Sequence, residues 1–218
     1  MGGFRHAVAI IALAAACERH ADKPLEDKAA PETCLADELG TLREGWDMLD
    51  ECETDSEACR AQCRDGDGDA CFHLAITVQA SRLADPRAHE LFLRSCKLGL
   101  ATGCTNWAAA AWVKTLGPSR QCLTRVFENT CASGDSFGCG MVGRILIEAR
   151  TSAVDLIRGQ VYLTLACAQH AATCNLLAMY YDDETFGPPD PAKAAALRKQ
   201  ACEGGNDSEC VAKPSDAN

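Results

Sequence analysis

The sequence has little positive charge and no long apolar run. Its 218 residues hold 21 Lys and Arg against 31 Asp and Glu, a formal net charge of −10 at pH 7. Nucleic-acid binding needs a basic surface to face the phosphates, so this charge balance argues against that class of partner. An apolar run near the N-terminus has about ten residues, whereas a helix that spans a bilayer needs about 20. With 47% hydrophobic residues the chain can still bury a core.

The sequence also lacks a catalytic motif that is both complete and placed in the secondary structure it requires. The serine motifs of β-lactam chemistry, S-x-x-K, S-D-N and K-T-G, do not occur, and Lys114-Thr115-Leu116 lacks the glycine of the third. His89-Glu90 begins an H-E-x-x-H motif, but Leu93 replaces the second histidine. Gly134–Gly138 matches G-x-S-x-G, which requires a preceding strand where this sequence predicts a helix. We therefore expect no enzyme activity, no catalytic residue and no cofactor.

The stretch CRDGDGDAC, residues 63–71, resembles the start of a calcium-binding loop. A loop that begins at Asp65 requires Gly at its sixth position and Glu at its twelfth, but Ala70 and Ile76 stand there. Zinc knuckles place cysteines two to four residues apart, and the two cysteines here are eight apart. We expect no metal here and interpret the aspartates as turn residues.

The N-terminus, MGGFRHAVAIIALAAAC, has the basic start, short apolar run and small residues of an export signal over residues 1–16. Small residues directly before Cys17 resemble a bacterial lipobox, which predicts lipidation of Cys17; plain secretion is the alternative. Residues 17–33 are polar and form the expected flexible tether. The expected location is the bacterial cell envelope, periplasm or outer membrane, with membrane contact only through the lipid anchor.

Fifteen cysteines predict an oxidising compartment, and ten of them recur as pairs. Their members are eight residues apart, or seven in the fourth pair, and the first cysteines follow one another at steps of 33, 35, 36 and 35. The pairs are Cys63 and Cys71, Cys96 and Cys104, Cys131 and Cys139, Cys167 and Cys174, and Cys202 and Cys210. A period near 35 predicts stacked helical hairpins.

Apolar residues keep the same register. Large apolar side chains lie three residues after the second cysteine, at Leu74, Trp107, Val142 and Leu177. Small residues lie one position later, at Ala75, Ala108, Gly143 and Ala178, and predict a close approach of neighbouring helices. Eight residues before the first cysteine stand Ala88, Leu123, Gly159 and Ala194. We predict a helix that ends at each first cysteine and another that begins at each second one.

These residues, with the helix start at Asp190 that matches D-x-x-K-A and the one at Asp155 in the same frame, resemble the Sel-one-like repeat in its cysteine-rich bacterial form, a relative of the tetratricopeptide repeat. The resemblance covers about residues 55–213. It implies an all-α, right-handed solenoid of about five helix–turn–helix repeats, each stapled by a disulfide between its two paired cysteines. A capping helix over 34–54 and a tail over 214–218 complete the expected organisation.

Besides Cys17, four further cysteines lie outside the pairs. Cys59 takes an apolar position of its helix, and Cys52 precedes that helix. We predict a bridge between them, which requires a break in the helix near residues 53–55. Cys34 and Cys122 either pair or stay free.

A second set of positions, two, six and nine residues before the first cysteine, forms a stripe separate from the apolar face; we call it the first-helix stripe. The resemblance implies that first helices line a concave groove, so a partner would meet this stripe. Its candidate contact residues are Arg87, Glu90, Arg94, Arg125, Asn129, Arg158 and Lys193. A merely solvated face is the alternative interpretation.

The expected function is a monomeric, exported scaffold that binds a protein or peptide at the envelope. The alternative, suggested by relatives within the resembled family, is a protein that binds or hydrolyses β-lactams or peptidoglycan.

Overall fold

The computed structural model describes residues 33–45, 47, 49, 52, 56–81, 85–114 and 117–206. Within these residues the chain is all-helical, with ten helices and no strand beyond one isolated bridge, as the sequence predicts. The predicted signal segment, the tether, Cys17, Cys210 and the predicted tail lie outside the described residues. The chain divides into an N-terminal unit that ends at Gly138 and a C-terminal unit that begins at Cys139.

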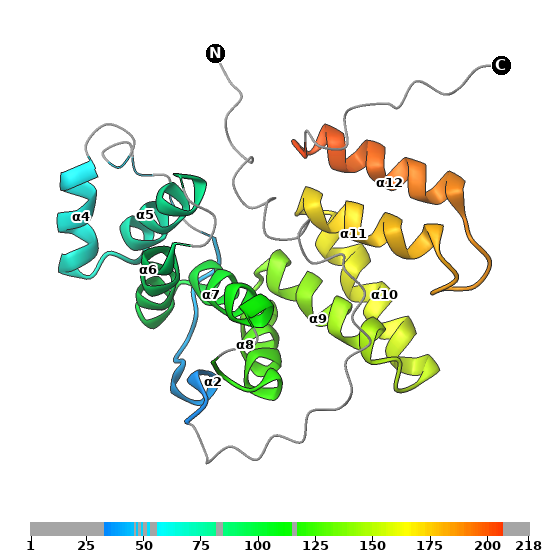
Figure 1. Ribbon diagram of the computed structural model, residues 1–218, viewed down its shortest axis with the longest axis horizontal. Coiled ribbons are helices and arrows are strands. Elements are labelled where there is room, and N and C mark those ends of the chain that lie inside the picture. The colour runs from blue at the N-terminus through cyan, green and yellow to red at the C-terminus, as the bar shows by residue number, and fades with distance from the viewer. Residues whose placement is uncertain are drawn as a thin grey trace. The chain divides into compact units, whose positions relative to one another are not determined.

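The N-terminal unit is built from consecutive antiparallel helices (Figure 1). It comprises α2 (Leu35–Glu38), α4 (Ser56–Asp65), α5 (Gly68–Ser81), α6 (Pro86–Lys97), α7 (Ala101–Lys114), α8 (Arg120–Ala132) and the start of α9 (Ser136–Ala149). From α4 to α8 each helix packs against the next, and the short α2 packs against α8, which follows it by more than 80 residues.

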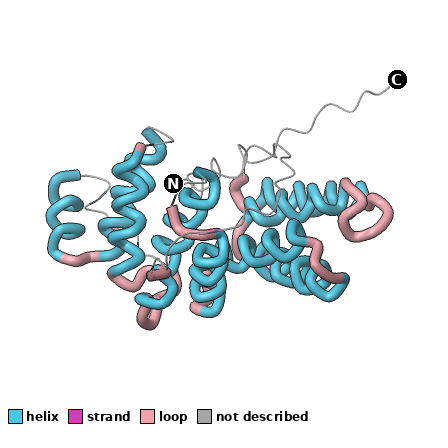
Figure 2. The backbone as a smooth tube through the Cα atoms, turned by 60° about the horizontal axis from the view of Figure 1, so that its bottom comes forward, coloured by secondary structure: helices cyan, strands magenta, loops and turns pink. Residues whose placement is uncertain are grey.

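The C-terminal unit continues the same pattern (Figure 2). It holds the rest of α9, then α10 (Ala153–Cys167), α11 (Ala171–Asp182) and α12 (Pro191–Glu203). Here α10 packs against α11, and α11 against α12. One core cluster joins Ile147, Leu163, Leu177 and Ala194 from all four helices.

The hairpin turns explain where each first helix stops. Gly66, Gly99, Gly134 and Gly205 each lie three residues after a first cysteine, and all four have φ between 90° and 103°. This left-handed conformation favours glycine, which has no Cβ to clash with the backbone. The fourth turn is one residue shorter, and His170 stands in that place.

The predicted core positions are confirmed in every repeat that the structure describes. Leu74, Trp107, Val142 and Leu177 are at most 9% exposed, and Ala75, Ala108 and Ala178 are fully buried. A Cβ added at Gly143 would lie 2.8 Å from the carbonyl oxygen of Gly159, so two helices meet there with almost no space between their backbones. The small residue at this position therefore permits the close approach that the sequence predicts.

Disulfides join neighbouring helices in the pairs that the resemblance implies. Complete bridges of this kind are Cys63–Cys71, Cys96–Cys104 and Cys167–Cys174, and Cys131, Cys139 and Cys202 are also disulfide-bonded. Cys52 is bridged to Cys59, as predicted. Cys34 is bridged to Cys122, which settles the alternative that the sequence left open. So many bridges fit an oxidising, extracytoplasmic environment.

Two boundaries differ from the sequence prediction. The second helices begin three residues before the second cysteine, and in α5 and α9 the capping residues Asp67 and Asp135 accept hydrogen bonds from the first turn. The helix predicted over 34–54 is shorter: α2 ends at Glu38, and residues 39–45, with Gly40 and Gly45, are not helical. No helix in the described part of the chain is both long and apolar enough to cross a membrane.

Candidate binding surface

The non-helical stretch after α2 belongs to a segment that lies along the N-terminal unit. We call residues 33–45 the strap. Its first anchor is the Cys34–Cys122 disulfide, whose two Cα atoms are 5.5 Å apart. Leu35 and Ala36 are buried directly after this bridge, whereas Asp37 and Glu38 are exposed. One short helical turn therefore presents an apolar face to α8 and an acidic face to solvent.

All three stripe positions of α8 hold the strap. Cys122 forms the disulfide, Arg125 pairs with Asp37, and the side-chain amide of Asn129 donates to the carbonyl oxygen of Ala36 at 3.2 Å. The Arg125–Asp37 pair uses two N–H donors, the bidentate geometry that guanidinium and carboxylate groups favour. The hydrogen bond from Arg125 lowers the pKa of the Asp37 carboxyl below its usual value.

Main-chain pairing forms the second anchor, at the turn between α6 and α7. The Arg43 amide donates to the carbonyl oxygen of Gly99 at 2.8 Å, and the Ala101 amide donates to the carbonyl oxygen of Arg43 at 3.0 Å. Arg43 and Leu100 thereby form an isolated parallel bridge. The Arg43 guanidinium then reaches Asp69 at 2.6 Å, and this contact raises the arginine pKa.

The acidic stretch CRDGDGDAC thus has two structural roles. Asp67 accepts hydrogen bonds from the amides of Asp69 and Ala70, at 2.8 and 3.0 Å, and so caps α5. Asp69 binds the strap through Arg43 and also accepts from the amide of Asp47. The turn role was predicted from the sequence; the contact with the strap was not.

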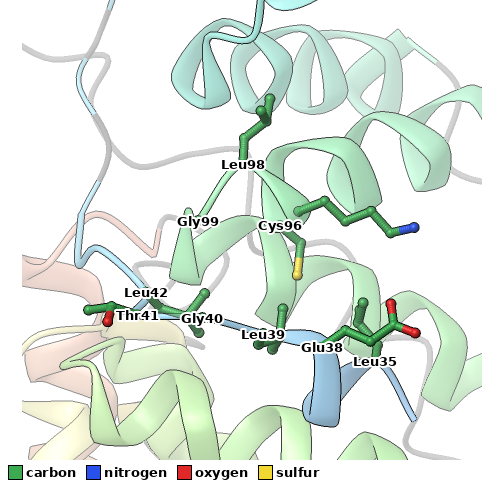
Figure 3. Close-up of a pocket in the computed structure, with 10 residues that line it drawn as sticks. Leu35, Glu38, Leu39, Gly40, Thr41, Leu42, Cys96, Leu98 and Gly99 are labelled. Atoms are coloured by element: carbon green, nitrogen blue, oxygen red, sulfur yellow. The ribbon is translucent and has the colours of Figure 1, made fainter. Parts of the chain in front are cut away.

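A pocket of about 370 Å³ lies between the strap and the end of α6 (Figure 3). Apolar side chains on both sides line it, with one charged residue from each side. The lining includes Leu35, Leu39, Leu42 and Leu98 together with Glu38 and Lys97. Leu98 is 43% exposed, so the pocket opens on to a partly apolar surface.

On α6 the stripe residues are exposed, and its two arginines bind groups of their own unit. Arg87 pairs with Asp85 just before the helix, with one N–O distance of 2.7 Å. Arg94 donates to the carbonyl oxygen of Arg64 at 2.9 Å. Glu90 lies exposed between them. These arginines help to hold the turns of their unit and are not gathered into one cluster.

The C-terminal unit carries a different stripe. Arg158 of α10 lies 3.7 Å from Asp155, and Lys193 of α12 lies over the ring of Tyr181 at 4.2 Å. The other two stripe residues of α10 are Val161 and Leu165, which are 52% and 62% exposed. On this helix the positions that hold the strap on α8 are therefore mostly apolar and open to solvent.

Of the predicted contact residues, the structure brings Arg125 and Asn129 together on the strap. Sequence reasoning missed the strap residues Asp37 and Arg43. The one signal was the presence of two cysteines outside the repeat pairs, Cys34 and Cys122, but a separation of 88 residues gives no local spacing to interpret.

No model of a known protein family matches the chain, and no curated protein matches it.

Proposed function

We propose that this protein is an exported repeat scaffold that binds a protein or peptide segment along its first-helix stripes. The observation that supports the proposal is the way in which the strap binds to the first-helix stripe of α8. One continuous segment of the chain contacts every stripe position of α8 and then pairs with the backbone of the turn between α6 and α7.

The contacts between the strap and the N-terminal unit are of the kinds by which proteins generally recognise peptides. A guanidinium binds a carboxylate, an amide binds a main-chain carbonyl, and a short backbone pairing extends the contact. All three contacts involve the backbone or a single acidic side chain of the bound segment, so a foreign segment can make them too. The stripe of α8 is therefore chemically a peptide-binding surface whose occupant is supplied by the same chain.

Open stripe positions remain for a partner. Glu90 on α6, Arg158, Val161 and Leu165 on α10, and Lys193 on α12 are all exposed. The apolar pair on α10 favours a partner with aliphatic side chains, because burying such side chains contributes roughly 25 cal/mol per Å². The basic residues beside them suit an acidic flank.

The larger arrangement is part of the proposal. The repeated glycine turns, the helix order and the staples support a right-handed solenoid of about five repeats. The disulfides support a site outside the cytoplasm, and the sequence around Cys17 supports a lipid anchor in the bacterial envelope.

Site-specific photo-crosslinking tests the proposal. A benzophenone amino acid is placed in the full chain at Val161, and a control is placed at Val113 of α7, which is not a stripe position and is 54% exposed. We expect an envelope protein to crosslink at Val161 and not at Val113. The purified partner should then bind the Val161→Asp, Leu165→Asp chain at least tenfold more weakly. Equal crosslinking at both positions, or unchanged affinity of the double variant, would contradict the proposal.

A further inference from the structure

A buried group of two cysteines and one histidine lies in the N-terminal unit. Cys52 precedes α4, Cys59 lies on α4, and His73 lies on α5; they are 9%, 0% and 8% exposed. The two sulfur atoms and one ring nitrogen of His73 all lie within 4.8 Å of one another. The bridge between Cys52 and Cys59 is thus covered by an imidazole in the core.

This bridge differs from the other bridges of the described residues. Among those residues it forms the one group in which three potential metal-ligand side chains come this close. The helix staples, such as Cys96–Cys104 and Cys167–Cys174, join cysteines without a third ligand of this kind. A third ligand is unnecessary for a staple, so His73 gives this bridge a potential ligand that the described staples lack.

The geometry points to a redox-gated site for a thiophilic divalent cation, Zn²⁺, formed by Cys52, Cys59 and His73. In the oxidised chain the two sulfurs are bonded to each other and bind no metal. A dithiol reductant transfers two electrons and two protons to this bond, becomes a disulfide itself, and leaves two cysteine thiols. Zn²⁺ then replaces both thiol protons, which pass to solvent, and accepts the lone pair of the neutral imidazole.

The dimensions suit this ion. Zinc binds thiolate sulfur at about 2.3 Å and imidazole nitrogen at about 2.0 Å, so its tetrahedral ligands lie roughly 3.5 Å apart. The three ligand atoms already lie within 4.8 Å of one another. Rotation of the cysteine and histidine side chains can bring them to the separation of roughly 3.5 Å that zinc requires. A set of two cysteines and one histidine is also a known zinc ligand set, in which a water completes the fourth position.

The surroundings favour the same ion through their charge. The two sulfurs lie in a core cluster with Ala70 and Leu74, against which Leu49 and Leu91 pack. A net charge is costly in such an apolar region. The charges of two thiolates and one divalent cation cancel, so the occupied site has no net charge. Two thiolates without the cation would carry a charge of −2.

Cobalt substitution in the full chain provides the test, because Co²⁺ in a tetrahedral thiolate site has visible absorption bands. The chain is treated with graded dithiothreitol, and differential alkylation with peptide mapping identifies the bridges that are open at each step. We expect Co²⁺ bands to appear when Cys52–Cys59 opens, with one ion per chain, and Zn²⁺ to displace the cobalt.

Matched variants separate this site from ordinary dithiols. His73→Gln should weaken Co²⁺ binding at least tenfold, because one of three protein ligands is lost. Cys96→Ser with Cys104→Ser removes a staple that has no such histidine, and it should leave the affinity unchanged. Equal affinity in the His73→Gln chain, or an equal loss in the staple variant, would overturn the inference. So would a chain whose helices, followed by circular dichroism, melt when Cys52–Cys59 opens and do not return with Zn²⁺.

Discussion

At the scale of single residues, one buried carboxylate with several hydrogen-bond donors is Asp135, in the turn before α9. It is 6% exposed and accepts hydrogen bonds from the hydroxyls of Thr102 and Thr105, at 2.9 and 3.1 Å, and from the Gly138 amide at 2.6 Å. Burial raises its pKa above the ordinary 3.8, although each hydrogen bond opposes the rise. One carboxyl group therefore fixes both the helix start and the contact with α7.

We predict that this residue has a pH signature. Because the folded pKa is raised, the carboxyl contributes stability that is complete below pH 3.8 and is lost as pH rises through the folded value. Asp135→Asn keeps a hydrogen-bond acceptor but cannot ionise. As the pH rises through the folded pKa of Asp135, the free energy of unfolding of this variant should therefore fall less than that of the wild type. Asp135→Ala should cost roughly 1 to 3 kcal/mol, since three donors lose their acceptor. Denaturant unfolding at several pH values measures both effects. Parallel pH profiles for wild type and Asp135→Asn would contradict the assignment.

At the scale of helices, α9 and α10 approach each other closely in the C-terminal unit, at two glycines. A Cβ at Gly143 would lie 3.0 Å from the backbone nitrogen of Leu163, and one at Gly159 would lie 2.6 Å from a side-chain carbon of Ile147. Interiors are packed too densely to absorb such contacts without backbone movement.

We predict that Gly143→Ala destabilises the chain by roughly 1 to 2 kcal/mol, even though alanine favours helices by about 1 kcal/mol over glycine. The matched control is Gly40→Ala, where an added Cβ meets nothing within 4 Å and the φ angle is ordinary. That variant should stay within about 0.5 kcal/mol of wild type. Thermal and urea unfolding of the two variants provide the comparison, and a neutral Gly143→Ala would show that the helices can separate at low cost.

Helix order, core positions and the local bridges could all be predicted from the sequence, because each depends on contacts inside one repeat period. Leu177 and Ala178, for example, occupy positions that Leu74 and Ala75 already define. The helix starts were misplaced by three residues; at α5, for example, the capping residue Asp67 was interpreted only as a turn residue. Residues 39–45 were wrongly expected to be helical. Arg43 in this stretch pairs with the backbone around Gly99 and Leu100, and no pattern in the neighbouring sequence indicates that contact.

At the scale of the whole molecule, the long bridge differs from the staples in the length of chain that it closes. Cys34–Cys122 spans 88 residues, whereas Cys96–Cys104 spans 8. On the chain-entropy account, closing the longer loop removes roughly 4.6 kcal/mol of unfolded-state entropy, and closing the shorter one roughly 2.6 kcal/mol.

We therefore predict that Cys34→Ala with Cys122→Ala lowers the free energy of unfolding more than Cys96→Ala with Cys104→Ala does, by about 2 kcal/mol. Denaturant unfolding followed through Trp107 and Trp112 fluorescence reports on helix α7, which lies within the long loop. A smaller loss for the long bridge would mean that the strap adds no stability beyond its own docking.

The central claim is that the first-helix stripe binds a segment through its side chains, and that the strap is the occupant of α8. Amide hydrogen exchange on three full-length chains tests it most directly: wild type, Cys34→Ser with Cys122→Ser, and the latter with Arg125→Ala and Asn129→Ala added. The account predicts that strap amides stay protected at least tenfold without the bridge. The amides of residues 35–38 should exchange freely once Arg125 and Asn129 are also truncated, while the Arg43 amide, which binds Gly99, and helices α6 to α8 remain protected. Amides of residues 35–38 that lose all protection with the bridge alone, or keep it without those two side chains, would contradict the claim.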